Sequence, residues 1–104
     1  MAFEKIIYKD DNTGVSASYW KICQINSNWM KENIYIRING YLNKEMRDER
    51  RSEILFREYL VDGALFNQYF GIDKLDLENS NIVKKAYECL RVLPNSDFVD
   101  AIDV

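Results

Sequence analysis

The chain contains no histidine, which limits the catalytic chemistry that its side chains could carry. Histidine is the side chain best suited to acid–base catalysis near neutral pH and is a common metal ligand. Triads that need a histidine base are therefore excluded, while carboxylate or lysine catalysis stays formally open. The two cysteines, Cys23 and Cys89, are too few for a zinc site. We expect both to be buried thiols rather than a disulfide.

Tyrosine and arginine side chains form the strongest candidate site. In the alternating run from Asn33 to Leu42, Tyr35, Arg37 and Tyr41 share one face. Such a face can stack the bases of a single-stranded nucleic acid, and it is also typical of protein interfaces. Because the net charge is −3 and no Lys/Arg-Gly-aromatic signature is present, we favour a protein interface and keep nucleic acid as the alternative. The predicted interface residues are Tyr19, Lys21, Tyr35, Arg37 and Tyr41.

The C-terminal stretch is acidic, with Asp97, Asp100 and Asp103 and no basic residue after Arg91. Its spacing differs from that of a calcium loop, so we expect an extended, solvated tail. We predict that Asp97 and Asp100 form a second contact with a partner. The stretch 44–58 balances five basic against five acidic residues, which is typical of a solvated connection. The glycines form no nucleotide-binding loop, and we expect no cofactor, metal or small-molecule substrate.

The elements that position these residues follow from hydrophobic periodicity and turn residues. Ile34, Ile36 and Ile38 lie on the face opposite the tyrosines, which indicates a half-buried strand. The predicted fold is α+β, an antiparallel sheet of three to four strands with one or two helices packed on one face. The expected strands are 3–8, 15–27, 33–42 and 54–61, and the expected helices are 64–70 and one from Asn79 or Ser80 to Val92.

The register between the second and third strands decides which side chains enter the core. If Ile22 lies opposite Ile38, Trp20 faces Gly40 and covers it. A slip of one residue exchanges the two faces of the strand. That slip would place Val15, Ala17, Tyr19, Cys23 and Ile25 on the isoleucine face. The sequence leaves both registers open, and we expect both sheet faces to be covered, one by a helix and the other by chain or another subunit.

The last predicted helix has an apolar stripe that should face the sheet. Its charged residues, Lys84, Lys85, Glu88 and Arg91, are expected on the outside. The predicted stripe consists of Ile82, Val83, Ala86, Cys89, Leu90 and Leu93.

Length and composition describe one small domain. The chain has 104 residues, of which 47% are hydrophobic and 13% aromatic, enough for a single core without metal or disulfide support. A net charge of −3 gives no general attraction to phosphate backbones or anionic membranes. No apolar run reaches the roughly 20 residues of a membrane span. The N-terminus has no apolar signal segment, so we expect synthesis and folding in a cytoplasm.

Five short stretches carry a resemblance to a known class of proteins. They are Ser18–Ile22 with Tyr-Trp-Lys-Ile, Asn39–Arg47 with Gly-Tyr followed by charges, Phe66–Phe70, Ala86–Leu90 with Ala-Tyr-Glu-Cys-Leu, and Phe98–Val104. In this order they resemble small structural proteins encoded among the tail genes of bacteriophages and of phage-derived contractile particles of Gram-positive bacteria.

The resemblance implies a tail or baseplate component, or an assembly factor, that works as a homo-oligomer. It implies no enzymatic activity and transfers no catalytic residue. The implied partners are further copies of the chain and other tail proteins. The implied location is the host cytoplasm during assembly and then the virion or phage-like particle.

Overall fold

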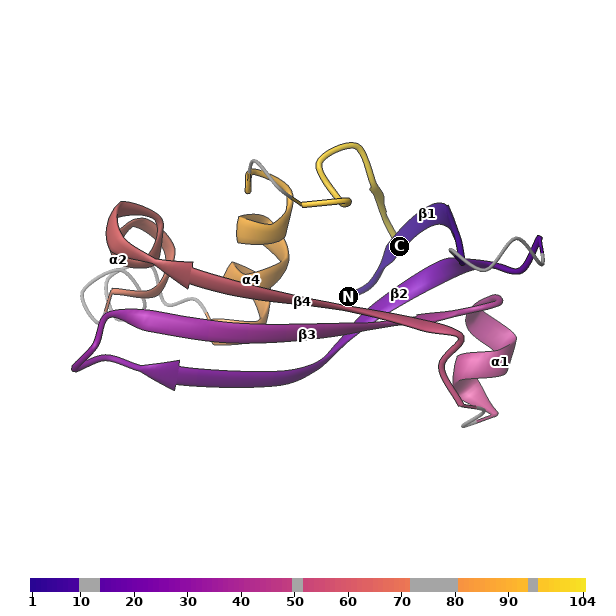
Figure 1. Ribbon diagram of the computed structural model, residues 1–104, viewed down its shortest axis with the longest axis horizontal. Coiled ribbons are helices and arrows are strands. Elements are labelled where there is room, and N and C mark those ends of the chain that lie inside the picture. The colour runs from indigo at the N-terminus through magenta and orange to yellow at the C-terminus, as the bar shows by residue number, and fades with distance from the viewer. Residues whose placement is uncertain (10–13, 50–51, 72–80, 94–95) are drawn as a thin grey trace.

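The computed structural model describes residues 1–9, 14–49, 52–71, 81–93 and 96–104. It is an α+β fold whose five-stranded antiparallel sheet has the order β4-β3-β2-β1-β5. In Figure 1, α2, α4 and the C-terminal segment lie on one side of the sheet, and α1 lies at one end of it. The elements are β1 (Phe3–Tyr8), β2 (Ser16–Asn28), β3 (Asn33–Tyr41), α1 (Lys44–Asp48), β4 (Leu55–Asp62), α2 (Gly63–Phe70), α4 (Ile82–Leu90) and β5 (Ile102–Asp103).

The predicted fold class is confirmed, with two short elements added to it. Helix α1 lies within the stretch expected to be a charged connection, and the side chain of Asn43 caps it by accepting a hydrogen bond from the Met46 amide at 2.9 Å. Strand β5 pairs with the start of β1, Phe3 opposite Asp103 and Glu4 opposite Ile102. Both additions are short elements that depend on local capping or on pairing with a distant strand, which periodicity does not reveal.

A β-bulge at Cys23 decides the register of β2. Before the bulge, Trp20 pairs with Gly40 and Ile22 with Ile38; after it, Ile25 pairs with Ile36. The extra residue in β2 reverses which side chains face the core. Trp20 and Ile22 therefore lie on the isoleucine face, as the first of the two registers requires, and Ile25 joins them as the second requires.

The core lies between the isoleucine face of the sheet and the helices. Ile34, Ile36 and Ile38 are fully buried on β3. Trp20 covers Gly40, and its indole Nε1–H donates to the Lys5 carbonyl oxygen at 3.0 Å. The alternation predicted for β3 is therefore confirmed, because every second residue of the strand is buried.

Helix α4 presents a somewhat different face from the predicted one. Its N-cap is Asn81, whose side chain accepts from the Lys84 amide at 2.7 Å, while the predicted caps Asn79 and Ser80 lie outside the described residues. Val83 was expected inside and is exposed, whereas Lys85 was expected outside and is buried. Lys85 lies one turn before the buried Cys89, at the edge of the buried face, and its ammonium group pairs with Glu88 at 3.7 Å. Tyr87, which was not part of the predicted stripe, is also buried, and its hydroxyl accepts from the Ile22 amide at 2.9 Å.

The C-terminal segment packs against the sheet, which corrects the expectation of an extended, solvated tail. Phe98 is fully buried, stacked on Phe3 at 5.4 Å and edge-on to Trp20 at 5.1 Å between ring centroids. The buried ring of Phe98 thus attaches the acidic segment to the core of the fold. Within the described parts of the chain, no helix is long and apolar enough to cross a membrane.

Candidate protein-interaction face

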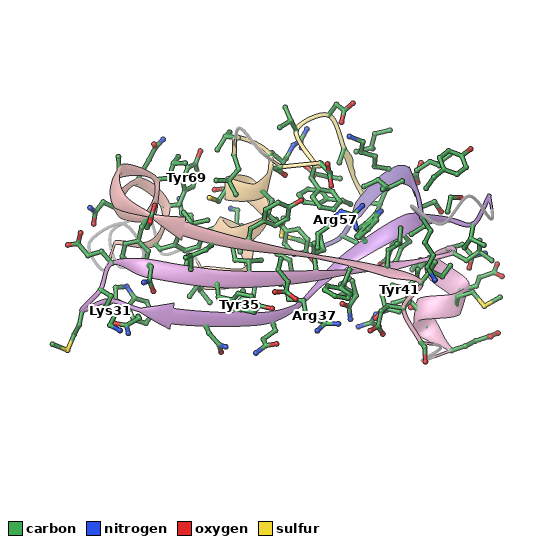
Figure 2. The ribbon with its side chains drawn as sticks, in the orientation of Figure 1. Lys31, Tyr35, Arg37, Tyr41, Arg57 and Tyr69 are labelled. Atoms are coloured by element: carbon green, nitrogen blue, oxygen red, sulfur yellow. The ribbon has the colours of Figure 1, made fainter. Side chains whose placement is uncertain are left out.

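The alternation of β3 projects one set of side chains away from the helices. Residues directly opposite one another in an antiparallel pair share a face, so the registers of β2 and β4 define the rest of this set. Figure 2 shows Tyr35, Arg37 and Tyr41 in a row along β3, with Arg57 and Tyr69 on the helix side. We call this set the outer face; it consists of Tyr19, Lys21, Gln24, Asn26, Tyr35, Arg37, Asn39, Tyr41, Phe56, Glu58 and Leu60.

Arg37 lies at the centre of the outer face and is held from several sides. Its guanidinium carbon is 4.2 Å from the centroid of the Phe56 ring, a cation–π contact. Its Nη2 is 3.3 Å from a Glu53 carboxylate oxygen, and its Nε–H donates to the Asn39 side chain at 3.2 Å. These contacts hold the guanidinium from several sides, so a partner would meet an ordered group with a small entropic cost of binding.

Tyr35 is linked to the neighbouring strand through Glu58. Desolvation raises the pKa of Tyr35, and the charge of Glu58 and a hydrogen bond to that carboxylate raise it further. The hydroxyl therefore stays protonated around neutral pH and acts as a donor to Glu58. The polar groups of β3 and β4 thus satisfy one another across the outer face.

Two apolar side chains of β4 remain exposed beside this polar network. Phe56 is 46% and Leu60 64% exposed. They flank Glu58 on the same face, because side chains two residues apart along a strand point the same way. Exposed aromatic and aliphatic groups next to an ordered arginine are the composition of a protein-binding surface.

Five of the seven predicted site residues come together on the outer face. The other two do not join them, because Asp97 and Asp100 lie near the helix side in ion pairs of their own. Asp97 bonds Arg57 Nε at 2.9 Å, and Asp100 accepts from Lys5 Nζ at 2.7 Å. The hydrogen bond from Lys5 lowers the pKa of Asp100. The five residues on the outer face are Tyr19, Lys21, Tyr35, Arg37 and Tyr41.

Sequence reasoning missed the contribution of β4 to this face. The alternation of residues 54–61 groups Phe56 with Glu58, but it does not say which strand lies beside β4. The register, in which Arg37 lies opposite Glu58, supplies that information. Glu53 pairs with Arg37, but the residues around it in the sequence show no pattern that would predict this contact.

The two thiols occupy different environments. Cys89 is buried as predicted, and burial raises its pKa to about 11. Cys23 is exposed, which corrects the expectation of two buried thiols. The bulge causes this, because the extra residue in β2 has no partner in β3 and turns its thiol toward the Arg37 carbonyl oxygen at 3.5 Å. Both cysteines are free.

An open groove of about 250 Å³ runs between the bulge of β2 and the first turn of α4. Its walls are mainly aliphatic and hold no acid–base pair. Among the described residues, no group of three or more His, Cys, Asp or Glu side chains is placed to hold a metal ion. The groove is lined by Ile22, Cys23, Gln24, Ile25, Ile82 and Val83.

Comparison with known proteins adds no relative to this description. No protein-family model, curated protein or solved structure matches the chain.

Proposed function

We propose that the chain is a structural or assembly protein that acts through self-association and contacts with other proteins, without catalysis. The observation that carries the proposal is the outer face, where an ordered Arg37 lies between tyrosines and the exposed Phe56 and Leu60. In the described structure α2, α4 and the C-terminal segment lie on the opposite side of the sheet (Figure 1). A second protein surface would bury the aromatic and aliphatic groups that they leave exposed.

The particular setting we propose is a phage tail, a baseplate or a phage-like contractile particle. This part rests on the resemblance of the five short stretches to small tail-gene proteins. It implies assembly in the host cytoplasm and a final place in the particle. The gene order tests it directly: genes for tube, sheath or fibre proteins are expected beside the gene for this chain. A neighbourhood of metabolic genes would overturn the assignment to a phage particle while leaving self-association to be tested separately.

Self-association is tested by measuring mass in solution and by substitution on the outer face. We expect the wild-type chain to exceed the monomer mass in light scattering at tens of micromolar. Tyr35→Ser should weaken this association about tenfold, the size of effect expected for a tyrosine near the centre of an interface, since Tyr35 lies beside Arg37 and opposite Leu60. Tyr8→Ser is the matched control, since Tyr8 is 63% exposed and lies outside the outer face. A monomer at all concentrations would overturn the proposal.

Single-stranded nucleic acid is the second candidate partner, and the row of Tyr35, Arg37 and Tyr41 on one strand is the observation that favours it. Two features argue against it. The net charge is −3, and Arg37 is already paired with Glu53. Fluorescence anisotropy with a labelled single strand at low salt separates the two candidates. Binding that weakens steeply as salt rises would support a nucleic-acid partner, and no binding at low salt removes it.

A further inference from the structure

We propose that β4 pairs with β4 of a second copy, antiparallel and about a two-fold axis at Glu58. This inference rests on the proposed self-association and names the strand, the register and the residue at its centre. The two five-stranded sheets would join into one continuous sheet, and the two outer faces into one surface. The occupant of the edge is a second copy of this chain, argued below from the pattern of β4 itself.

The sheet has its long open edge at β4. This strand lies at one edge of the sheet order β4-β3-β2-β1-β5. All eight of its residues pair with β3, from Asp62 opposite Asn33 to Leu55 opposite Gly40. Its other side faces no strand among the described residues. The opposite end of the sheet is different, since the two-residue strand β5 covers the start of β1 there. A long edge with free backbone groups is a template for pairing with another strand.

The sequence of β4 has nearly the same character when read from either end. Counting outward from Glu58, the residues at equal distance are Arg57 and Tyr59, then Phe56 and Leu60, then Leu55 and Val61. In an antiparallel pair centred on one residue, these are the residues that face each other across the interface. The β4 strand is therefore complementary to β4 of a second copy in this register.

The register centred on Glu58 matches apolar with apolar side chains on the outer face. Phe56 would lie opposite the partner's Leu60, and the same contact would occur a second time through the symmetry. These are the two side chains of β4 that the isolated chain leaves 46% and 64% exposed. The contact would remove the apolar area of both side chains from water, which favours the pairing.

The neighbouring symmetric registers are worse. A centre at Arg57 would place Arg57 opposite its own copy and Phe56 opposite Glu58. A centre at Tyr59 would place Phe56 opposite Asp62 and Leu60 opposite Glu58. Both registers bring an apolar side chain against a carboxylate, and the first also brings two like charges together. The pattern of charge and hydrophobicity along β4 thus selects Glu58 as the centre.

Glu58 limits the strength of this pairing, because two carboxylates would face each other at the axis. Like charges directly opposite one another destabilise a strand pair. The pairing is still possible, since each carboxylate accepts a hydrogen bond from Tyr35 and lies beside Arg37, its partner across β3 and β4. Glu58 therefore keeps the edge contact weak and reversible, and its replacement should strengthen the contact.

Cysteine cross-linking tests the register. In a Cys23→Ser background, which leaves only the buried Cys89, Glu58→Cys is expected to form a disulfide dimer with itself on mild oxidation. Leu60→Cys alone should not, because its expected neighbour is Phe56 of the other copy. A mixture of Phe56→Cys and Leu60→Cys chains should form the mixed dimer. Self-linking of Leu60→Cys in preference to Glu58→Cys would overturn the register.

Charge substitution tests the same contact without a covalent bond. Glu58→Gln should lower the dimer dissociation constant by about threefold, as removal of a like-charge pair predicts. Wild-type chains mixed with Glu58→Lys chains should form heterodimers in preference to either homodimer. If the wild type associates but neither the substitutions nor the cross-link at position 58 has the expected effect, the edge pairing is wrong. Self-association would then use another surface, and the proposed function would still hold. A wild-type monomer removes both.

Discussion

Trp20 can lie flat against β3 only because residue 40 has no side chain. A methyl group at this position would come within 2.8 Å of two indole carbons and 2.9 Å of the Ala17 methyl group. Carbon atoms in contact are normally about 3.5 to 4.0 Å apart. Both neighbours are fully buried, so neither has room to give way. This glycine therefore allows the largest buried side chain of the protein to cover the centre of the sheet.

We predict that Gly40→Ala destabilises the protein by about 1–3 kcal/mol, the usual cost of overfilling a packed core. The sign is informative, because alanine is ordinarily better than glycine inside a strand by roughly 0.5–1 kcal/mol. Urea unfolding monitored by tryptophan fluorescence measures the change. Asn26→Ala, at an exposed position of β2, is the control and should change stability by less than about 0.5 kcal/mol. An unchanged unfolding midpoint for Gly40→Ala would contradict the packing described for Trp20.

Cys89 ties the stability of the fold to alkaline pH. Burial raises the pKa of its thiol to about 11 in the folded chain, whereas a thiol in an unfolded chain titrates near 8.5. Between these values the unfolded chain has lost the proton and the folded chain has kept it. The unfolded state therefore binds fewer protons, and stability falls as pH rises through this window. Burial raises the pKa of Tyr59 and Tyr87 as well, so these tyrosines act in the same direction at higher pH.

We predict that Cys89→Ala removes part of this alkaline loss. The wild type should lose about 2 kcal/mol more stability between pH 8 and pH 10 than the variant does. The variant is expected to be less stable at pH 8, because it leaves a small cavity, and the prediction concerns only the difference in slope. Urea unfolding at several pH values provides the measurement. Cys23→Ala is the comparison variant: desolvation raises the pKa of this exposed thiol as well, but less than that of Cys89, so this variant should change the slope less. Equal slopes for Cys89→Ala and the wild type would contradict the prediction.

Among the elements, β2 shows how far sequence reasoning reaches and where it ends. Alternation in β3, the apolar run of β1 and the helical spacing of 64–70 are local patterns, and each predicted its element closely. In β2 both faces carry large apolar side chains, so the pattern fits two registers equally. The bulge at Cys23 combines the two registers, one on each side of it. Its position is set by the pairing of β2 with β3, which the sequence of β2 alone does not reveal.

The candidate site was predictable on β3 and, for Tyr19 and Lys21, on β2, but not on β4. Tyr35, Arg37 and Tyr41 follow from the alternation of their own strand. Phe56 and Leu60 belong to the same surface only because β4 pairs with β3 in the observed register. The expectation of a solvated acidic tail was wrong for a related reason. The segment packs against the sheet through Phe98, whose ring contacts Phe3 and Trp20, far away in the sequence.

The C-terminal segment is an integral part of the fold because Phe98 and several ion pairs attach it to distant elements. Arg57 and Lys5 hold Asp97 and Asp100, and Arg91 holds Asp103 at 2.6 Å. These pairs are partly exposed and each contributes little on its own. The buried ring of Phe98 is therefore expected to supply most of the stabilisation.

We predict that Phe98→Ala destabilises the protein by about 3–5 kcal/mol, the range for removing a fully buried aromatic side chain. Val99→Ala is the matched control, since Val99 is 53% exposed and lies on the same segment. Thermal unfolding by circular dichroism separates the two variants. If Phe98→Ala were as stable as Val99→Ala, the segment would not be anchored through its aromatic ring, and a role for its aspartates in contacting a partner would gain support.

At the scale of the whole molecule, charge and surface composition act in opposite directions on association. Every copy carries a net charge of −3, so two copies repel each other at long range. The surfaces proposed to meet are aromatic and aliphatic, with backbone pairing at the edge of β4, and these attractions depend weakly on salt. Added salt screens the repulsion, since the Debye length falls from about 30 Å at 0.01 M to about 10 Å at 0.1 M.

We predict that self-association strengthens about twofold to threefold when sodium chloride rises from about 0.02 M to 0.3 M. Sedimentation equilibrium at the two salt concentrations provides the dissociation constants. The direction distinguishes this mechanism from the alternatives, because binding to nucleic acid weakens with salt. Association that weakens with salt would instead show that Arg37 and Lys21 attract acidic groups of the neighbouring copy. Glu58→Gln lowers the repulsion at the contact itself, so its association should depend less on salt than that of the wild type, which locates the repulsion at the edge of β4.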